Sequence, residues 1–360
     1  MKRVFISDCE GPISRNDNAF ELTGHYVPEG TRLFTIISRY DDVLADVLKR
    51  SGYKAGDTLK LILPFLKAYG ITDQKMHDYS ARSLVLIPNV KETLRFVRSM
   101  CPAFIVSTSY EHYIKTLCKA IRFPFRNTYC TRLKIDKYRV AKSEKVRLIE
   151  IAEEIVRMLV IEIPPNAKSL KDFSEREQNA IQRLDEIFWK EIADMEVGRL
   201  YSELNPVGGS EKAEAAKDVV QKLSTNLSDV MYVGDSITDT DAFKMVRENG
   251  GLTVSFNGNQ YAIENAEIAV LSETSLVTAV LADAFCRLGK RHVLSLAENW
   301  NRETLEEDSA NPDLLNSLFR SCPQRLPRVK IITDQNKPIL AKESTEFRKK
   351  VRGEAIGRLG

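Results

Sequence analysis

Acidic side chains follow the first apolar run of the chain. Residues 4–6 are apolar, and Gly11 and Pro12 end the segment, a pattern typical of a buried strand that breaks into a turn. Asp8 and Glu10 lie at the break, where a parallel strand delivers side chains into the crevice beyond its carboxyl end. A buried acid needs a metal or a hydrogen-bond donor, and it can serve as a nucleophile or a hard-cation ligand. The alternative for Asp8 is an aspartate that only caps the turn.

Two later apolar runs, 103–106 and 230–233, also end in groups that could do chemistry. These groups are Ser107 and Thr108 after the first run, and Asp235 and Asp239 after the second. Because the carboxyl ends of parallel strands meet at one edge of a sheet, we expect the acids and hydroxyls to form one oxygen-rich site. Such a site suits Mg²⁺, which takes one or two carboxylates together with waters and phosphate oxygens.

A lysine and a glycine fit the same site. Lys212 begins a predicted helix after Gly209 and could bring the compensating positive charge, although the alternative is an ordinary surface lysine. Gly234 is expected to let the backbone turn sharply so that Asp235 faces inward. For Asp239 the alternative is an acid at a helix N-terminus, stabilised by the helix dipole.

The alternation of strand and helix patterns predicts an α/β fold with a mostly parallel sheet. The predicted parts are a core of 1–16, 85–140 and 206–290, a helical cap of 17–84, a helical insert of 141–205 and a C-terminal extension of 291–360. The insert reads as a helical hairpin whose apolar stripe is core or a subunit contact. Within the extension, residues 329–333 predict an edge strand. The tail from Lys342 has six basic and three acidic residues, which predicts a solvated helix.

The amino-acid composition argues against several classes of function. The chain has 360 residues, 43% hydrophobic and 29% charged, as in an ordinary globular protein of two or more compact units. A net charge of +3 gives no reason to expect nucleic acid, and no apolar run approaches the length of a membrane span. The six cysteines and four histidines lack metal-ligand spacing, so we expect reduced thiols and a cytoplasmic location.

Four segments in this order resemble the motifs of the haloacid dehalogenase (HAD) superfamily, and its phosphoserine-phosphatase-like branch in particular. They are FISDCEG for motif I, FIVSTS for motif II, SEKAEAAKDVV for motif III and YVGDSITDTDAFK for motif IV. The resemblance covers the core segments. It implies a HAD-like Rossmannoid core with a helical cap after the first strand.

The resemblance also implies roles for individual residues. Asp8 would be the nucleophile that forms an aspartyl-phosphate, and Glu10 would be the acid and base. The implied phosphate-binding residues are Ser107, Thr108 and Lys212, and the implied Mg²⁺ ligands are Asp8, Glu10, Asp235 and Asp239. The implied activity is Mg²⁺-dependent hydrolysis of a small phosphomonoester. The alternative is a weakly active or inactive scaffold that binds a phosphorylated ligand or a protein partner, with the 141–205 helices as a homodimer or partner contact.

Some features depart from the family pattern. Glu10 stands where the family usually has aspartate, and its extra methylene moves the carboxyl group. The insert at 141–205 has no counterpart in small phosphoserine phosphatases. Separately, the sequence Glu-Gly-Pro at 10–12 resembles that of an archaeal group of HAD-like proteins. Arg32, Arg39 and Tyr40 are cap residues that could select the leaving group, and the alternative is that they lie on the solvated face of the cap.

Overall fold

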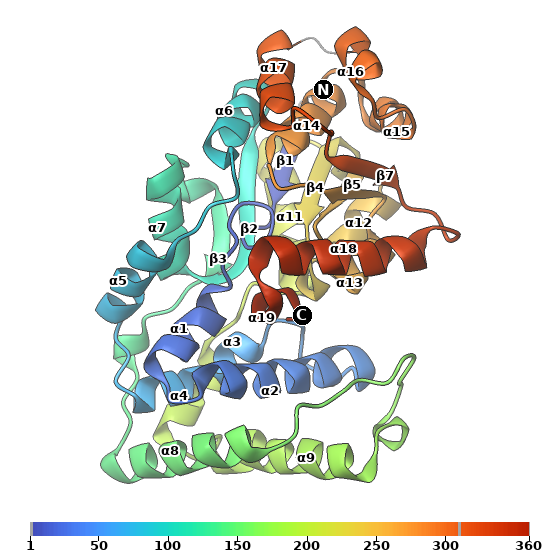
Figure 1. Cartoon of the computed structure of the whole chain (residues 1–360). Helices are drawn as coiled ribbons and strands as arrows, with labels where there is room; N and C mark the ends of the chain where they lie inside the picture. Colours follow the sequence, from blue (N-terminus) through green and yellow to red (C-terminus); the bar gives the residue numbers. More distant parts are fainter. Residues whose placement is uncertain (1–2, 309–310, 360) are drawn as a thin grey trace.

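The computed structural model describes residues 3–308 and 311–359. Its centre is a seven-stranded sheet in the order β3-β2-β1-β4-β5-β6-β7, with helices on both faces (Figure 1). Neighbouring strands pair in parallel except β6 and β7, which are antiparallel. The predicted α/β class with a mostly parallel sheet is therefore confirmed.

The first strand lies in the middle of this sheet, between β2 and β4. The strands are β1 Val4–Ser7, β2 Ala103–Tyr110, β3 Thr128–Thr131, β4 Val230–Gly234, β5 Leu252–Phe256, β6 Ile268–Leu271 and β7 Arg328–Ile331. Ile6 is in register with Phe104 on one side and with Tyr232 on the other. The predicted edge strand is thus confirmed as β7.

Alternate residues of the central strand face two apolar layers, because side chains of a strand alternate between the faces of the sheet. Phe5 packs into the layer that contains α6 and α14, whereas Ile6 packs into the layer that contains α11. The helices around the sheet are α6 Val90–Met100, α7 Glu111–Ile121, α11 Ser210–Leu223, α12 Thr240–Glu248, α13 Gln260–Asn265 and α14 Leu276–Leu288.

The predicted cap and the predicted insert share one apolar core. Their helices are α1 Asn18–Tyr26, α2 Gly30–Asp42, α3 Thr58–Leu61, α4 Leu63–Ala68, α5 Asp73–Ser83, α8 Lys142–Arg157, α9 Glu175–Glu186 and α10 Leu200–Glu203. Ile37 and Leu66 from the cap pack in the same cluster as Leu148, Leu184 and Phe188 from the insert. This body lies below the carboxyl ends of the strands in Figure 1. The apolar stripe of the insert is thus covered within the chain.

The C-terminal extension returns to the sheet. Its helices are α15 Lys290–Glu298, α16 Arg302–Asp308, α17 Pro312–Ser321, α18 Lys337–Arg352 and α19 Glu354–Gly357. The basic tail was predicted to be a solvated helix, and this prediction is wrong for one face of α18, where Leu340, Ser344, Arg348 and Arg352 are buried. None of the helices in the described residues is long and apolar enough to cross a membrane.

Candidate functional site

The three strand ends that carry reactive groups meet, as predicted. Asp8 directly follows β1, and its backbone N–H donates to the Val233 carbonyl of β4 at 2.8 Å. Asp235 directly follows β4, and Ser107 lies in β2, the other neighbour of β1. The side chains come together because β1 lies between the two strands that bear the other groups.

Lys212 lies at the centre of the site with no exposed surface. Its Nζ donates to Asp8 Oδ2 at 2.6 Å and to Asp239 Oδ1 at 2.8 Å. The alternative interpretation of Lys212 as a surface lysine is therefore wrong. A single ammonium group ties the motif after β1 to the motif after β4, and it shields the two carboxylates from each other.

Asp239 organises the turn after β4. Besides Lys212, the Tyr232 hydroxyl donates to its Oδ1 at 3.0 Å, and the backbone N–H groups of Asp235 and Ser236 donate to its Oδ2 at 3.0 and 3.2 Å. Gly234 makes room for this carboxylate, because a Cβ there would lie 2.4 Å from Asp239 Cγ. The close approach of the Asp239 side chain gives a reason for glycine at this position, and the predicted role of Gly234 in a sharp turn stays a prediction.

Burial and charge act in opposite directions on this group. Burial raises the pKa of Asp8, the Lys212 ammonium lowers it, and the neighbouring carboxylates of Asp239 and Asp235 raise it again. Burial lowers the pKa of Lys212, but Asp239 and Asp8 outweigh it, so that its net pKa lies above its ordinary value. Lys212 therefore stays charged, and the site keeps a fixed positive centre beside Asp8.

Glu10 turns toward the cap. Its Oε1 accepts a hydrogen bond of 2.7 Å from the backbone N–H of Asn18, at the start of α1. Burial, followed by the nearby carboxylate of Asp17, raises the pKa of Glu10 well above its usual range. A carboxyl group with a raised pKa can hold a proton near neutral pH, which a general acid requires.

The hydroxyl cluster of β2 lies at a bulge between Ser107 and Tyr110. Ser107 Oγ donates to Ser109 Oγ at 3.2 Å, and it accepts from the Ser109 backbone N–H at the same distance. Thr108 Oγ1 is buried and has no hydrogen-bond partner among the described residues. Because a buried polar atom without a partner costs free energy, Thr108 marks a place where a ligand oxygen would be favourable.

A cavity of about 100 Å³ lies over these strand ends. The core contributes Asp8, Glu10, Ser107, Thr108, Asp235, Ser236 and Thr238; the cap contributes Asp17, Phe34, Ser38, Asp41, Asp42, Gly56 and Thr58; and the C-terminal extension contributes Arg348, Arg352 and Leu359. Three parts of the chain that are distant in sequence therefore enclose one polar chamber. It has room for several waters or a small ligand.

Two arginines complete the site, and the sequence analysis missed both. Arg348 and Arg352, 3% and 8% exposed, reach Asp235 from α18. Arg352 Nη1 donates to Asp235 Oδ2 at 3.0 Å, and Arg348 Nη1 contacts the same oxygen more closely. The signal that could have found them is spacing: with Leu340 and Ser344 they form a buried stripe at four-residue steps, the period of one helix face.

The carboxylates fit a hard divalent cation. Asp8, Asp235 and Asp239 each offer an oxygen, and these oxygens lie within 4.8 Å of one another. Both oxygens of Asp239 already accept two hydrogen bonds each, so Asp8 and Asp235 are the better candidate ligands. Gly11 leaves space at Asp235, because a Cβ there would lie 2.1 Å from Oδ2. Asp239 and Glu10 as metal ligands stay predictions.

The cap residues proposed to choose a leaving group lie elsewhere. Arg32 donates to the carbonyls of Val156 and Met158 in the insert, and the Tyr40 hydroxyl contacts Asp185 there. Arg39 donates to Asp42 and to the Arg358 carbonyl. These side chains join the cap to other parts of the chain, and the opposite face of α2 lines the cavity instead.

Comparisons with known proteins give a fold. No family model matches, and no curated protein matches. The solved structure of gene product AF1437 from Archaeoglobus fulgidus is 24% identical and covers 100% of this chain and 99% of its own, with a TM-score of 0.80. This chain therefore has the fold of AF1437 over its whole length.

Phosphoserine phosphatases are also among the structural neighbours. The apo form is 12% identical over 76% of this chain and 96% of its own, with a TM-score of 0.46. A phospho-aspartyl intermediate analogue of phosphoserine phosphatase is 12% identical over 74% and 92%, with a TM-score of 0.45.

Proposed function

We propose that the protein is a Mg²⁺-dependent phosphatase that hydrolyses a small phosphomonoester through an aspartyl-phosphate on Asp8. The observation that carries this proposal is the position of Asp8. It lies at the end of the central strand, with Lys212 on one oxygen and a chamber in front. Phosphoryl transfer is mainly positioning and charge neutralisation around an in-line displacement, and this arrangement supplies both.

The site residues would act in two successive displacements at phosphorus. In the first, an Asp8 oxygen bonds to phosphorus while the bond to the leaving oxygen breaks, and Glu10 gives that oxygen its proton. In the second, Glu10 takes a proton from water, whose oxygen bonds to phosphorus as the bond to Asp8 breaks. Lys212 holds Asp8 in place and neutralises charge in both steps. Mg²⁺ bound by Asp8 and Asp235 would add positive charge beside the phosphoryl oxygens.

Ser107 and Thr108 would hold the phosphoryl group. Thr108 Oγ1 is buried without a partner in the described residues, and Ser107 also lines the chamber. Hydroxyl groups here would donate hydrogen bonds to phosphate oxygens, and Thr108 would thereby gain the partner that it lacks. The cap would exclude water during the first displacement and select the leaving group.

The direct test is hydrolysis of an aryl phosphate with and without Mg²⁺, followed by a panel of phosphomonoesters. Asp8→Asn should lower turnover roughly a thousandfold or more, because the amide cannot form the acyl phosphate. Beryllofluoride should bind the wild type with Mg²⁺ but not Asp8→Asn. Substantial activity of a clean Asp8→Asn preparation would exclude the covalent mechanism.

One observation favours the alternative function, a scaffold that binds a phosphorylated ligand or a partner with little turnover. Asp235 already has two guanidinium partners, so Asp8, Asp235 and Asp239 have cationic partners within the chain itself, namely Lys212, Arg348 and Arg352. Glu10→Asp separates the two functions. If the variant is active where the wild type is not, the scaffold function is supported. If the wild type is active and the variant is slower, the enzyme function is supported.

A further inference from the structure

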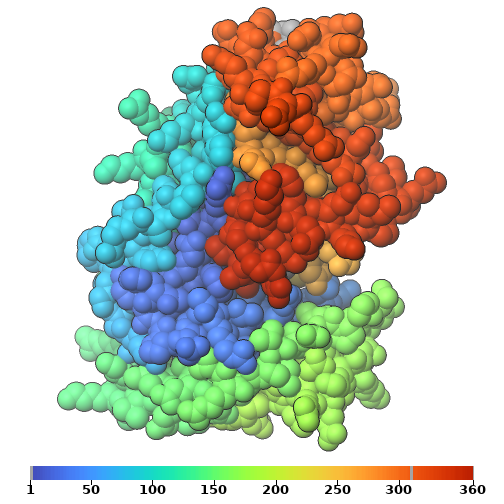
Figure 2. Space-filling view, viewed as in Figure 1, coloured from blue at the N-terminus to red at the C-terminus, as the bar shows by residue number. Residues whose placement is uncertain are grey.

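The two arginines of α18 come from far along the chain to a single carboxylate. Arg348 and Arg352 lie 113 and 117 residues after Asp235, and both contact its Oδ2. Arg348 Nη1 also donates to the Asp235 carbonyl at 3.2 Å. Figure 2 shows the C-terminal segment in red against the blue N-terminal segment.

The helix that carries the arginines is held in place by the core. The Ser344 hydroxyl donates to the Gly258 carbonyl at 2.6 Å, and Leu340 packs with Ile263 and Leu271. Arg352 also donates from Nε to the Arg15 carbonyl at 3.0 Å. The guanidinium groups are therefore built into the site and are not surface side chains that happen to reach it.

A divalent cation and the guanidinium groups compete for Asp235. A cation bound to this carboxylate would lie about 2.0–2.6 Å from an oxygen. Two guanidinium groups already contact Oδ2, and their charge repels a cation at the same carboxylate. Both contacts are to Oδ2, so the arginines weaken metal binding at this carboxylate, and its affinity for a divalent cation should rise when an arginine leaves it.

The chamber offers the arginines another partner when an anion is present. Arg348 Nε is buried and has no hydrogen-bond partner among the described residues, and Thr108 Oγ1 shares this property. Both residues line the same chamber. A phosphate group suits this wall of the chamber, because a guanidinium presents paired donors that match two phosphate oxygens.

We propose that Arg348 and Arg352 exchange partners during ligand binding. They neutralise Asp235 when no phosphomonoester is bound, and they turn to the anionic group of the ligand when a phosphomonoester enters. The exchange frees Asp235 for the divalent cation, so that anion and metal bind with positive coupling. This inference rests on the proposed phosphatase site, and it adds two substrate-binding residues from the C-terminal extension.

The test measures Mg²⁺ binding by calorimetry on the full chain, with and without inorganic phosphate. Arg348→Gln should bind Mg²⁺ on the order of tenfold more tightly than the wild type when phosphate is absent. Phosphate should tighten Mg²⁺ binding of the wild type by a similar factor and of the variant by much less. If phosphate only bridges to the metal, Arg348→Gln will not change the phosphate-free affinity, and the exchange is refuted.

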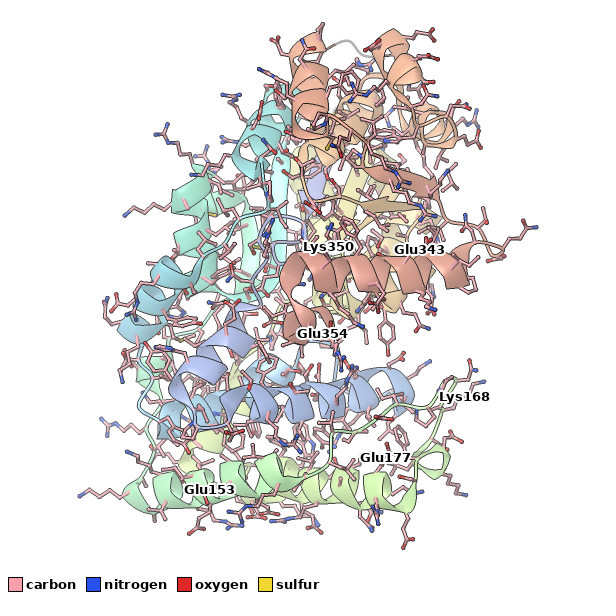
Figure 3. The ribbon with its side chains drawn as sticks, viewed as in Figure 1. Glu153, Lys168, Glu177, Glu343, Lys350 and Glu354 are labelled. Atoms are coloured by element: carbon pink, nitrogen blue, oxygen red, sulfur yellow. The ribbon has the colours of Figure 1, made fainter. Side chains whose placement is uncertain are left out.

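A matched variant controls for the loss of one positive charge. Lys350 lies on the same helix, two residues from Arg348, and is 67% exposed beside Glu273 (Figure 3). Lys350→Gln should leave the phosphate-free Mg²⁺ affinity at the wild-type value. An equal gain of affinity in Lys350→Gln and Arg348→Gln would mean that net charge alone is responsible, which contradicts the exchange.

Two further variants keep the proposal testable if Arg348→Gln does not fold. Arg348→Lys keeps the charge of the buried site but loses the paired donors, and its phosphate-free Mg²⁺ affinity should lie between those of the wild type and Arg348→Gln. Arg352→Gln should shift the affinity in the same direction as Arg348→Gln. Weaker or unchanged Mg²⁺ binding in every variant that folds would overturn the proposal.

The outcomes separate this inference from the proposed function. If the wild type hydrolyses phosphomonoesters but the arginine variants leave Mg²⁺ affinity unchanged, the phosphatase function holds and the exchange is wrong. If the wild type turns over no phosphomonoester, but Arg348→Gln tightens Mg²⁺ binding and phosphate tightens it in the wild type, the exchange holds and the phosphatase function is wrong.

Discussion

Asp239 and Asp235 lie on the same turn after β4, and both are buried, but their hydrogen-bond donors come from different parts of the chain. Asp239 is satisfied by Lys212, Tyr232, Ser236 and the Asp235 backbone, all of them 27 residues away or fewer. The Asp235 carboxylate is held by side chains 113 and 117 residues away, on a helix of the C-terminal extension.

This difference separates a fixed carboxylate from an exchangeable one. The donors of Asp239 belong to β4, its turn and the neighbouring α11, so the carboxylate cannot lose them without disrupting the core. The donors of Asp235 are two side chains of α18, and in our proposal they exchange this carboxylate for the ligand. We therefore expect substitutions around Asp239 to change stability, and substitutions around Asp235 to change ligand binding.

The largest effect on stability is expected from Lys212→Met. Removing the ammonium leaves Asp8 and Asp239 buried without their shared cation, and breaking such a buried pair costs about 3–5 kcal/mol. Urea unfolding, monitored by circular dichroism, measures the loss. Lys217→Met, on the exposed side of the same helix, is the control and should change stability little. Equal unfolding midpoints for the two variants would show that the central ammonium is not required for the fold.

A smaller effect on stability is expected from Mg²⁺, and it distinguishes Asp235 from Asp239. At a hundredfold excess over its dissociation constant, the metal should stabilise the wild type by about 2–3 kcal/mol, because it binds only the folded state. Asp235→Asn should lose this response, whereas Asp239→Asn should be less stable without metal but keep most of the response. Thermal melting with increasing Mg²⁺ provides the measurement. The fixed and exchangeable assignments are reversed if Asp239→Asn loses the response and Asp235→Asn keeps it.

The smallest expected effect is a pH dependence of stability that arises from two neighbouring aspartates of the cap. Asp41 accepts hydrogen bonds from the Tyr53 hydroxyl and from two backbone N–H groups, whereas Asp42 accepts one from Arg39. Burial raises the pKa of Asp41 to about 7 and that of Asp42 to about 6. A carboxyl group with a raised folded pKa contributes stability that is present below its unfolded pKa and is lost as pH rises through the folded value.

Asp42→Asn tests this dependence. Between pH 5 and pH 7 the wild type should lose about 1 kcal/mol of stability more than the variant, because only the wild type releases the proton of Asp42 in that window. Urea unfolding at both pH values measures the difference, and Asp78→Asn, an exposed aspartate of the same cap, is the control. Parallel stability curves for the wild type and Asp42→Asn would contradict the raised pKa.

Much of the site could be predicted from the sequence because its parts are local patterns. Asp8 and Asp235 each follow a buried apolar run, Lys212 stands in the first turn of an amphipathic helix, and Asp239 lies four residues after Asp235. Chain order then predicts a parallel sheet, and a parallel sheet brings the carboxyl ends of its strands to one edge. The predicted residues converge for this general reason.

The sequence by itself determined the strands, the turn residues and the groups at the strand ends, since these depend on neighbours a few positions away. Only the tertiary structure decided where the long-range partners lie. The insert packs its apolar stripe on the cap, and α18 buries Arg348 and Arg352 instead of exposing them to solvent. A helical stripe shows which face is covered but not what covers it, and a buried arginine is stable only beside a carboxylate that the fold brings to it. The partners of Asp235, Arg348 and Arg352, reach it only because the C-terminal extension packs on the sheet.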